Sequence, residues 1–158
     1  PLVHEDGRGG ELHHLEHDFA AVMTPGLHLA FSDRQKIALS GQTVLGEKAA
    51  REIWVCGAGA FVILKALAFR SRGHPKDAFD LYYVIRNYGS GPEEVAVHVD
   101  SLLADPFTRE GIQILREDFV EGDVGPSRVS RFVSGESMDD VVSDVAGFVR
   151  RFLDFLDV

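Results

Sequence analysis

The feature that most constrains the fold is a long apolar run that contains a single lysine. The segment "GAFVILKALAFRSR", residues 59–72, is too long and too rich in alanine for a strand and predicts a helix. Lys65 is the only charged residue between Glu52 and Arg70. A helix that is apolar on most sides is buried on most sides. The lysine must therefore reach water, pair with a carboxylate or meet a bound anion.

A second helix is predicted directly after the first. The turn Gly73-His74-Pro75 ends the first helix, because the residue before a proline avoids the helical region. Proline suits the first turn of a helix, so the second helix is expected to start near Pro75 and to stop at Gly89.

The helical spacing predicts that four charged side chains face one another across this turn. Arg72 follows Lys65 by seven positions and so lies near the same helix face. Asp77 and Asp80 are three apart and share a face of the second helix. Two cations on one helix can therefore approach two carboxylates on its antiparallel neighbour.

The rest of the chain predicts strands first and helices afterwards. Residues 1–10 are polar, rich in glycine and expected to be poorly ordered. Residues 17–23 and 27–31 predict short strands, or a helix plus a strand, and residues 36–40 and 51–56 predict antiparallel strands. Helical patterns follow over residues 95–104, 108–120 and 138–158. The predicted fold class is α+β, with a short antiparallel or mixed sheet in residues 1–56 and a helical bundle in residues 57–158.

Charge and cysteine content narrow the range of functions. The net charge of -9 arises in residues 91–158, which hold fifteen acidic and six basic side chains, so non-specific binding to nucleic acid is not expected there. The segment 65–86 has five basic residues against two aspartates, and an anionic ligand should prefer it. One cysteine, no apolar run long enough for a membrane and no export signal predict a cytoplasmic protein without membrane contact.

Two explanations of the charged residues are open on spacing alone. In the first, they form a structural network in which Asp77 caps a helix and Asp80 pairs with Arg72. In the second, Lys65 and Arg72 neutralise the oxygens of a polyphosphate, and the aspartates hold these cations in place.

The order of these residues resembles a known motif. The string is Lys65-x6-Arg72-x3-Lys76-Asp77-x2-Asp80-Leu81-Tyr82 and follows a predicted strand. It resembles the distal motifs of nucleotidyltransferases of the AbiEii/AbiGii toxin family, and weaker likeness covers most of the chain. The resemblance implies a polymerase-β-like fold and Mg²⁺-dependent transfer of a nucleoside monophosphate from a nucleoside triphosphate to an acceptor, which is RNA in some members. It also implies an antitoxin protein as a partner in some members.

The resemblance assigns roles to individual residues. Lys65, Arg72 and Lys76 would bind the phosphates of the nucleotide. Asp77 and Asp80 would belong to the catalytic group, where they orient the cations and hold the two helices together.

The sequence departs from the family in its front half. Family members carry a Gly-Ser motif and a downstream aspartate before this region, and both are missing here. Gly89-Ser90 comes too late, and Leu102 stands where a second carboxylate is needed. The chain starts at a proline, so a metal-binding front half is expected to have been removed or never to have existed. Asp18 is the candidate for a surviving magnesium ligand.

Two other functional classes are open. One is a non-catalytic interaction or regulatory module, whose partner would be an antitoxin-like protein or a second copy paired through an open sheet edge. The other is a small metal-binding protein, because His13 and His17 have the i, i+4 spacing of one helix face.

Overall fold

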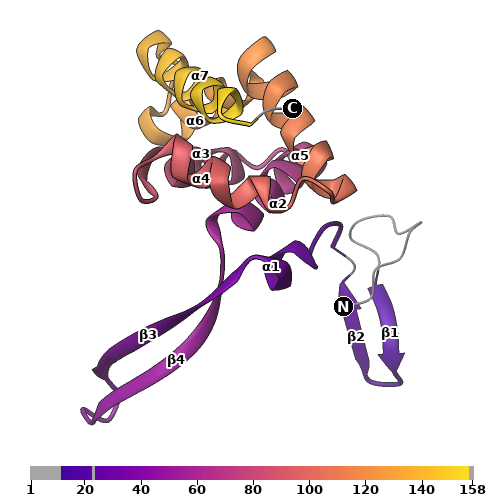
Figure 1. Ribbon diagram of the computed structural model, residues 1–158, viewed down its shortest axis with the longest axis vertical. Helices are drawn as coiled ribbons and strands as arrows, with labels where there is room; N and C mark the ends of the chain where they lie inside the picture. Colours follow the sequence, from indigo (N-terminus) through magenta and orange to yellow (C-terminus); the bar gives the residue numbers. More distant parts are fainter. Residues whose placement is uncertain (1–11, 23, 157–158) are drawn as a thin grey trace.

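The chain folds into a helical bundle from which two β-hairpins project (Figure 1). The structure is a computed structural model that describes residues 12–22 and 24–156. Its strands and helices are β1 (Leu12–Glu16), β2 (Phe19–Val22), α1 (Leu29–Ser32), β3 (Arg34–Gln42), β4 (Lys48–Cys56), α2 (Ala58–Arg72), α3 (Pro75–Asn87), α4 (Pro92–Asp100), α5 (Pro106–Arg116), a π-helical turn η1 (Glu117–Glu121), α6 (Val124–Ser134) and α7 (Asp139–Asp154). The predicted α+β class is confirmed, as is the order of sheet before helices. The expectation for residues 1–10 lies outside the described residues.

Both hairpins are two-stranded and antiparallel. β3 and β4 pair without interruption over nine residues each, from Arg34 opposite Cys56 to Gln42 opposite Lys48. The connecting turn uses Gly46 at a φ of 81°, a left-handed value that glycine adopts without strain. This confirms the antiparallel strands predicted over residues 36–40 and 51–56. The sequence predicted that residues 17–23 and 27–31 form two short strands, or a helix plus a strand. The short helix α1, residues 29–32, overlaps the second of these segments.

The helices α2 and α3 form the predicted helical hairpin. α2 ends where Gly73 takes a left-handed φ of 66° and donates its N–H to the Phe69 carbonyl at 2.7 Å. Pro75 then occupies the first turn of α3. The short turn forces the two helices to run antiparallel and to share one interface.

Asp33 fastens the base of the long hairpin to the bundle. Its carboxylate accepts a hydrogen bond from the Ala60 N–H at 2.9 Å, in the first turn of α2. Its backbone carbonyl accepts a second one from the Gly57 N–H at 2.5 Å. A carboxylate at this place is favoured by the exposed N–H groups and by the dipole of the helix. The start of α2 therefore receives its cap from a residue that lies before β3.

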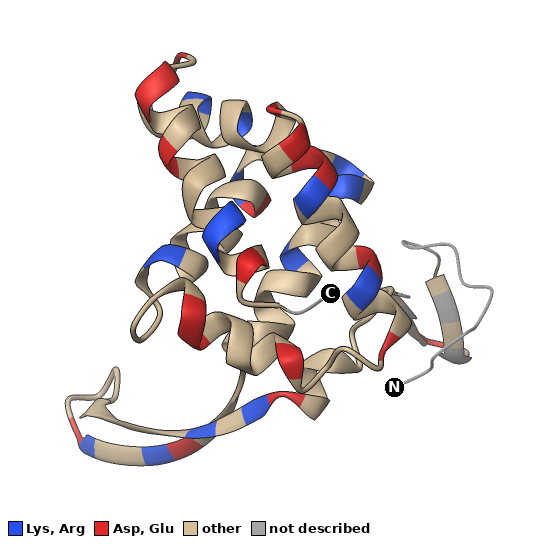
Figure 2. Ribbon diagram, turned by 45° about the horizontal axis from the view of Figure 1, so that its top comes forward, with Lys and Arg blue, Asp and Glu red and all other residues tan. Residues whose placement is uncertain are grey.

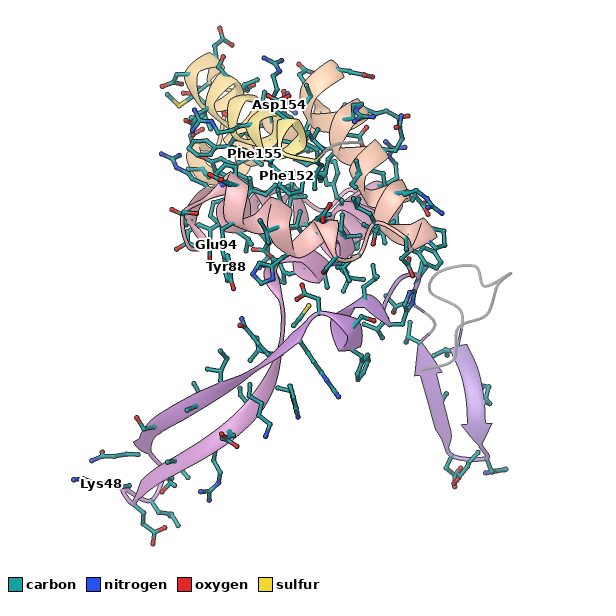
Figure 3. All side chains as sticks on the ribbon, in the orientation of Figure 1. Lys48, Tyr88, Glu94, Phe152, Asp154 and Phe155 are labelled. Atoms are coloured by element: carbon teal, nitrogen blue, oxygen red, sulfur yellow. The ribbon has the colours of Figure 1, made fainter. Side chains whose placement is uncertain are left out.

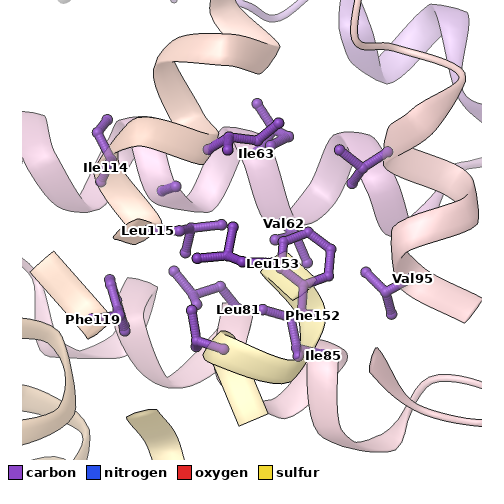
Figure 4. Close-up of a cluster of buried hydrophobic side chains, with 14 of the residues drawn as sticks. Val62, Ile63, Leu81, Ile85, Val95, Ile114, Leu115, Phe119, Phe152 and Leu153 are labelled. Atoms are coloured by element: carbon purple, nitrogen blue, oxygen red, sulfur yellow. The ribbon is translucent and has the colours of Figure 1, made fainter. Parts of the chain in front are cut away.

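The hydrophobic core lies between the helices of the bundle (Figure 4). Phe152 of α7 is fully buried, and its ring lies near Val62 of α2 and Ile85 of α3 in the close-up. Phe119, in the π-helical turn, packs against Phe69 with ring centroids 5.4 Å apart. Among the hairpin side chains that the structure describes, Cys56 at the end of β4 is the one that packs against this core.

The later helices differ in detail from the sequence prediction. α4 begins three residues earlier than predicted and ends at Asp100. The helix predicted over residues 108–120 is α5 followed by the π-helical turn. The closing helix ends at Asp154. Among the residues that the structure describes, no helix is long and apolar enough to cross a membrane.

A close crossing of α2 and α4 gives a prediction about Gly59. A Cβ atom at this position would lie 2.7 Å from the His98 backbone carbon, and backbone atoms cannot move aside as a side chain can. Gly59→Ala should therefore lower the free energy of unfolding by about 1–3 kcal/mol. Gly147→Ala is the matched control, because it also lies within a helix but its Cβ would meet no atom within 4 Å. That change should raise stability by up to about 1 kcal/mol. Urea denaturation of both variants checks this, and similar stabilities would contradict the crossing.

Candidate functional site

Five charged side chains from the two facing helices form one connected cluster, which we call the Lys–Arg–Asp cluster. α2 supplies Lys65 and Arg72, and α3 supplies Lys76, Asp77 and Asp80. The Lys65 ammonium group lies between both carboxylates, 2.9 Å from Asp77 Oδ1 and 2.7 Å from Asp80 Oδ2. Arg72 donates to both oxygens of Asp77, through Nε at 2.7 Å and Nη2 at 2.8 Å. Lys76 donates to both oxygens of Asp80, at 2.9 and 2.7 Å.

Burial decreases from the inside of the cluster to its outer edge. Asp77 is 1% exposed and is the only buried charged residue among those described. The side chain of Lys65 is 22% exposed, that of Arg72 56% and that of Lys76 66%. The two carboxylates thus lie inside, and two of the three cations present their outer sides to solvent.

The pKa shifts of Lys65, Arg72, Asp77 and Asp80 all favour the charged forms of these groups. For Asp77, burial is the largest single influence and raises the pKa, but the hydrogen bonds from Arg72 and Lys65 outweigh it. The pKa of Asp77 is therefore below its usual value, and that of Asp80 is lowered in the same way by Lys65 and Lys76. Burial also lowers the pKa of Lys65, and the bonds to Asp80 and Asp77 raise it above its usual value. With three cations and two carboxylates, the cluster carries a charge of about +1.

The sequence predicted the members of the cluster better than their pairing. Arg72 binds Asp77, and Asp80 binds Lys65 and Lys76, so the expected pair of Asp80 with Arg72 is wrong. Asp77 lies in the first turn of α3 but makes no capping hydrogen bond, because its oxygens are bonded to Lys65 and Arg72.

Asp18 is not brought near the cluster. It lies in the turn between β1 and β2, its side chain is 94% exposed, and it bonds His17 at 2.8 Å. Figure 1 shows this hairpin apart from the helical bundle. His13 lies on β1 and His17 in the same turn, so the two do not share a helix face as the metal-binding hypothesis required.

The described residues do not provide a site for Mg²⁺. Asp77 and Asp80 already accept hydrogen bonds from cations, whose charge repels a metal ion. Within the described part of the chain, no group of three or more His, Cys, Asp or Glu side chains is arranged to hold a metal. Magnesium is usually bound by one or two carboxylates together with substrate phosphates, and both carboxylates of the cluster are already bonded to cations.

A second polar group, on the opposite side of α3, was missed by the sequence interpretation. The Tyr82 hydroxyl donates to Asp144 Oδ2 of α7 at 2.5 Å, and Arg86 bonds both the hydroxyl and, at 2.6 Å, the carboxylate. These three residues lie in a groove of about 670 Å³ between α3, α6 and α7. Burial is the main cause of the raised pKa of Tyr82. The spacing Tyr82-x3-Arg86 was a local signal, but Asp144 is 62 residues away.

Ion pairs elsewhere in the bundle provide a comparison for the cluster. Arg70, two residues before Arg72, bonds Asp118 and Glu117 of the π-helical turn at 2.9 Å each. Figure 2 shows that acidic and basic segments lie side by side across the bundle and along the β3–β4 hairpin. The carboxylate partners of Arg70 are 42% and 21% exposed, whereas the partner of Arg72 is only 2% exposed, which distinguishes the cluster from an ordinary surface pair.

Comparison with known proteins leaves this geometry as the main source of functional inference. No family model, no curated protein and no solved structure matches the chain.

Proposed function

We propose that this chain is part of a nucleotidyltransferase-like protein and that the Lys–Arg–Asp cluster binds the phosphates of a nucleoside triphosphate. The observation that carries the proposal is the convergence of three cations on two carboxylates at a helix–helix interface. The cluster has an excess of positive charge in a protein whose net charge is -9. The order of its residues along the chain resembles that in the AbiEii/AbiGii toxin family.

The cations keep hydrogen-bond donors for a ligand. A guanidinium group has five N–H donors, and Arg72 uses Nε and Nη2 on Asp77. The Arg72 side chain is 56% exposed, so a ligand can reach its remaining N–H donors. Lys76 is exposed to a similar degree. A phosphate can therefore bind without breaking the bonds that hold the cations.

The aspartates act as positioning residues in this proposal. The bidentate pair with Asp77 fixes the plane of the Arg72 guanidinium group, and Asp80 restrains Lys65 and Lys76. Cations that are oriented before the ligand arrives lose less conformational entropy on binding. Magnesium would be held by carboxylates outside the described residues, and no catalytic step is assigned to Asp77 or Asp80. An RNA acceptor, an antitoxin-like protein and a cytoplasmic location remain proposals that depend on the same resemblance.

Nucleotide binding by matched arginine variants tests the proposal. Fluorescence titrations with labelled ATP, GTP, CTP and UTP should detect binding of at least one of them by the unchanged chain. Arg72→Met should weaken that binding at least about tenfold, because a charge-assisted bond to phosphate is lost. Arg70→Met is the control, since it removes a guanidinium group from the same helix, two positions away, and should change binding less than about twofold.

The same titration distinguishes the second candidate function, a non-catalytic interaction module. The near-complete burial of Asp77 and its bonds to Lys65 and Arg72 of α2 favour this alternative, because ion-pair networks can also serve only to hold helices together. If none of the four nucleotides binds, or if both arginine variants weaken binding equally, the cluster is structural and the nucleotidyltransferase proposal is wrong.

A further inference from the structure

The long β3–β4 hairpin has an unprotected edge along β3. Among the described residues, the sheet has only these two strands, so each strand is paired on one side only. Figure 3 shows the hairpin extending from the bundle, with Lys48 near its far end. An isolated two-stranded hairpin is marginally stable in water, and three or more strands are usually needed.

The hydrogen-bond pattern shows which backbone groups face the open edge. At one end of the hairpin, the Thr43 N–H bonds the Glu47 carbonyl at 2.9 Å, and at the other end the Gly57 N–H bonds the Asp33 carbonyl. Hydrogen-bonded and non-hydrogen-bonded pairs alternate in an antiparallel ladder. Counting from either end, the even-numbered residues of both strands direct their N–H and C=O groups outward. Ala38, at the middle of β3, and Ala50, on β4, are two of these residues.

Only one of the two edges carries the usual protection. Natural proteins guard open edges with charged residues, prolines and bulges. β4 has Lys48, Arg51 and Glu52 in its outer two thirds. The six residues from Ile37 to Gln42 of β3 contain no charge and no proline, and the pairing there has no bulge.

We propose that β3 pairs with β3 of a second copy of the chain, antiparallel and centred on Ala38. This register is the one that uses all nine residues of the strand, and it places outward-facing backbone groups opposite one another. Ile37 then lies opposite Leu39 of the second copy, in a non-hydrogen-bonded pair where side chains approach closely. The charged residues of β3 meet neutral ones, with Lys36 opposite Ser40 and Arg34 opposite Gln42. No like charges are directly opposed, so the edge is complementary to itself.

The side chains on the two faces of the β3–β4 hairpin also favour a second copy of the chain as the partner. Ile37 and Leu39 share one face with Ile53 of β4, and both Leu39 and Ile53 are about half exposed. Pairing through β3 joins these residues with those of the second copy into one apolar cluster, which is bordered on each outer strand by Arg51, opposite Leu39. On the other face, Trp54 stays with its own cations, Arg34 at 4.4 Å and Lys36 at 5.4 Å from the ring centroid.

A proline scan of the two edges tests the proposal by sedimentation velocity over a range of concentrations. The unchanged chain should form dimers, and Ala38→Pro should weaken dimerisation at least about tenfold, because it removes an outward N–H at the centre of the interface. Ala50→Pro makes the same chemical change on the outward side of β4 and should leave dimerisation unchanged. A chain that stays monomeric at every concentration, or equal effects of the two prolines, would overturn the proposal.

Disulfide trapping gives a readout that does not require a destabilising substitution. In a Cys56→Ser background, Ala38→Cys places two thiols opposite each other across the symmetry axis. The expected Cα separation of about 5.5 Å lies in the range of a disulfide. Mild oxidation should then yield a covalent dimer from Ala38→Cys and little from Ala50→Cys. A dimer that is trapped equally at both positions, or at neither, would count against pairing through β3. The inference is independent of nucleotide binding.

Discussion

Asp77→Asn is expected to lower the free energy of unfolding by about 3 kcal/mol, the loss typical of removing one partner from a buried ion pair. Asp77 is almost fully buried and, among the described residues, is the only one that bonds both Lys65 and Arg72 of α2. The amide side chain keeps the volume of the carboxylate but presents an N–H₂ group to one of two cations. Urea denaturation followed by circular dichroism measures the change.

The control for this substitution is Asp118→Asn. Asp118 also bonds an arginine of α2, but its own side chain is 21% exposed and keeps access to water, whereas that of Asp77 is 2% exposed. The expected loss is below about 1 kcal/mol. Equal losses in the two variants would show that the burial of Asp77 has no special importance.

The same residue should control stability in acid. Because the pKa of Asp77 is lower in the folded protein than in the unfolded chain, its contribution is complete above the unfolded value, about pH 4. The contribution is lost as the pH falls from there through the folded pKa. Asp77→Asn should therefore show a shallower decrease of stability below pH 4 than the unchanged chain.

Phe152→Ala should have the second of the two largest effects, a loss of about 3–5 kcal/mol. The ring is fully buried in the core of the bundle, where α7 packs against α3 and α4 (Figure 4). Its removal deletes apolar contacts and leaves a cavity that surrounding helices fill only in part. Thermal and urea denaturation should both detect the loss.

Phe155→Ala is the matched control for the core prediction. Phe155 is less than one turn further along the chain (Figure 3). It is 48% exposed, so its truncation removes far fewer buried contacts than that of Phe152. The expected change is below about 1 kcal/mol. A loss at Phe155 as large as that at Phe152 would contradict the placement of α7.

Local spacing explains why the cluster could be predicted. Lys65, Arg72, Asp77 and Asp80 lie on two helices joined by a turn of two residues, so helical geometry and a short connection fix which faces meet. The pairing could not be predicted, because it depends on offsets of a few ångströms between the helices. Lys76 was assigned to the phosphate-binding group by resemblance, and its bond to Asp80 follows the i, i+4 rule.

Features that depend on tertiary packing were not predictable from local sequence. The meeting of Asp144 with Tyr82 and Arg86 requires the docking of α7 against α3, across 62 residues of sequence. The i, i+4 spacing of His13 and His17 indicated a helix face, but β1 pairs with β2 and the spacing loses its meaning in an extended strand. Asp33 caps α2 from 27 residues earlier in the sequence, with the whole β3–β4 hairpin in between. No local sequence pattern predicts this contact.

The position of Asp33 allows the β3–β4 hairpin and the helical bundle to change independently during evolution. The hydrogen bond between its carbonyl and the Gly57 N–H means that the chain leaves the bundle and returns to it at one point. The β3–β4 hairpin, from Arg34 to Cys56, therefore starts and ends at neighbouring positions on the bundle. A change in its length does not alter the distance between Asp33 and Gly57 at its base. Insertions or deletions in matched pairs within the hairpin would change its reach in steps of about 3.4 Å per residue. The helices could keep their packing throughout, so the reach of the arm and the stability of the bundle can evolve separately.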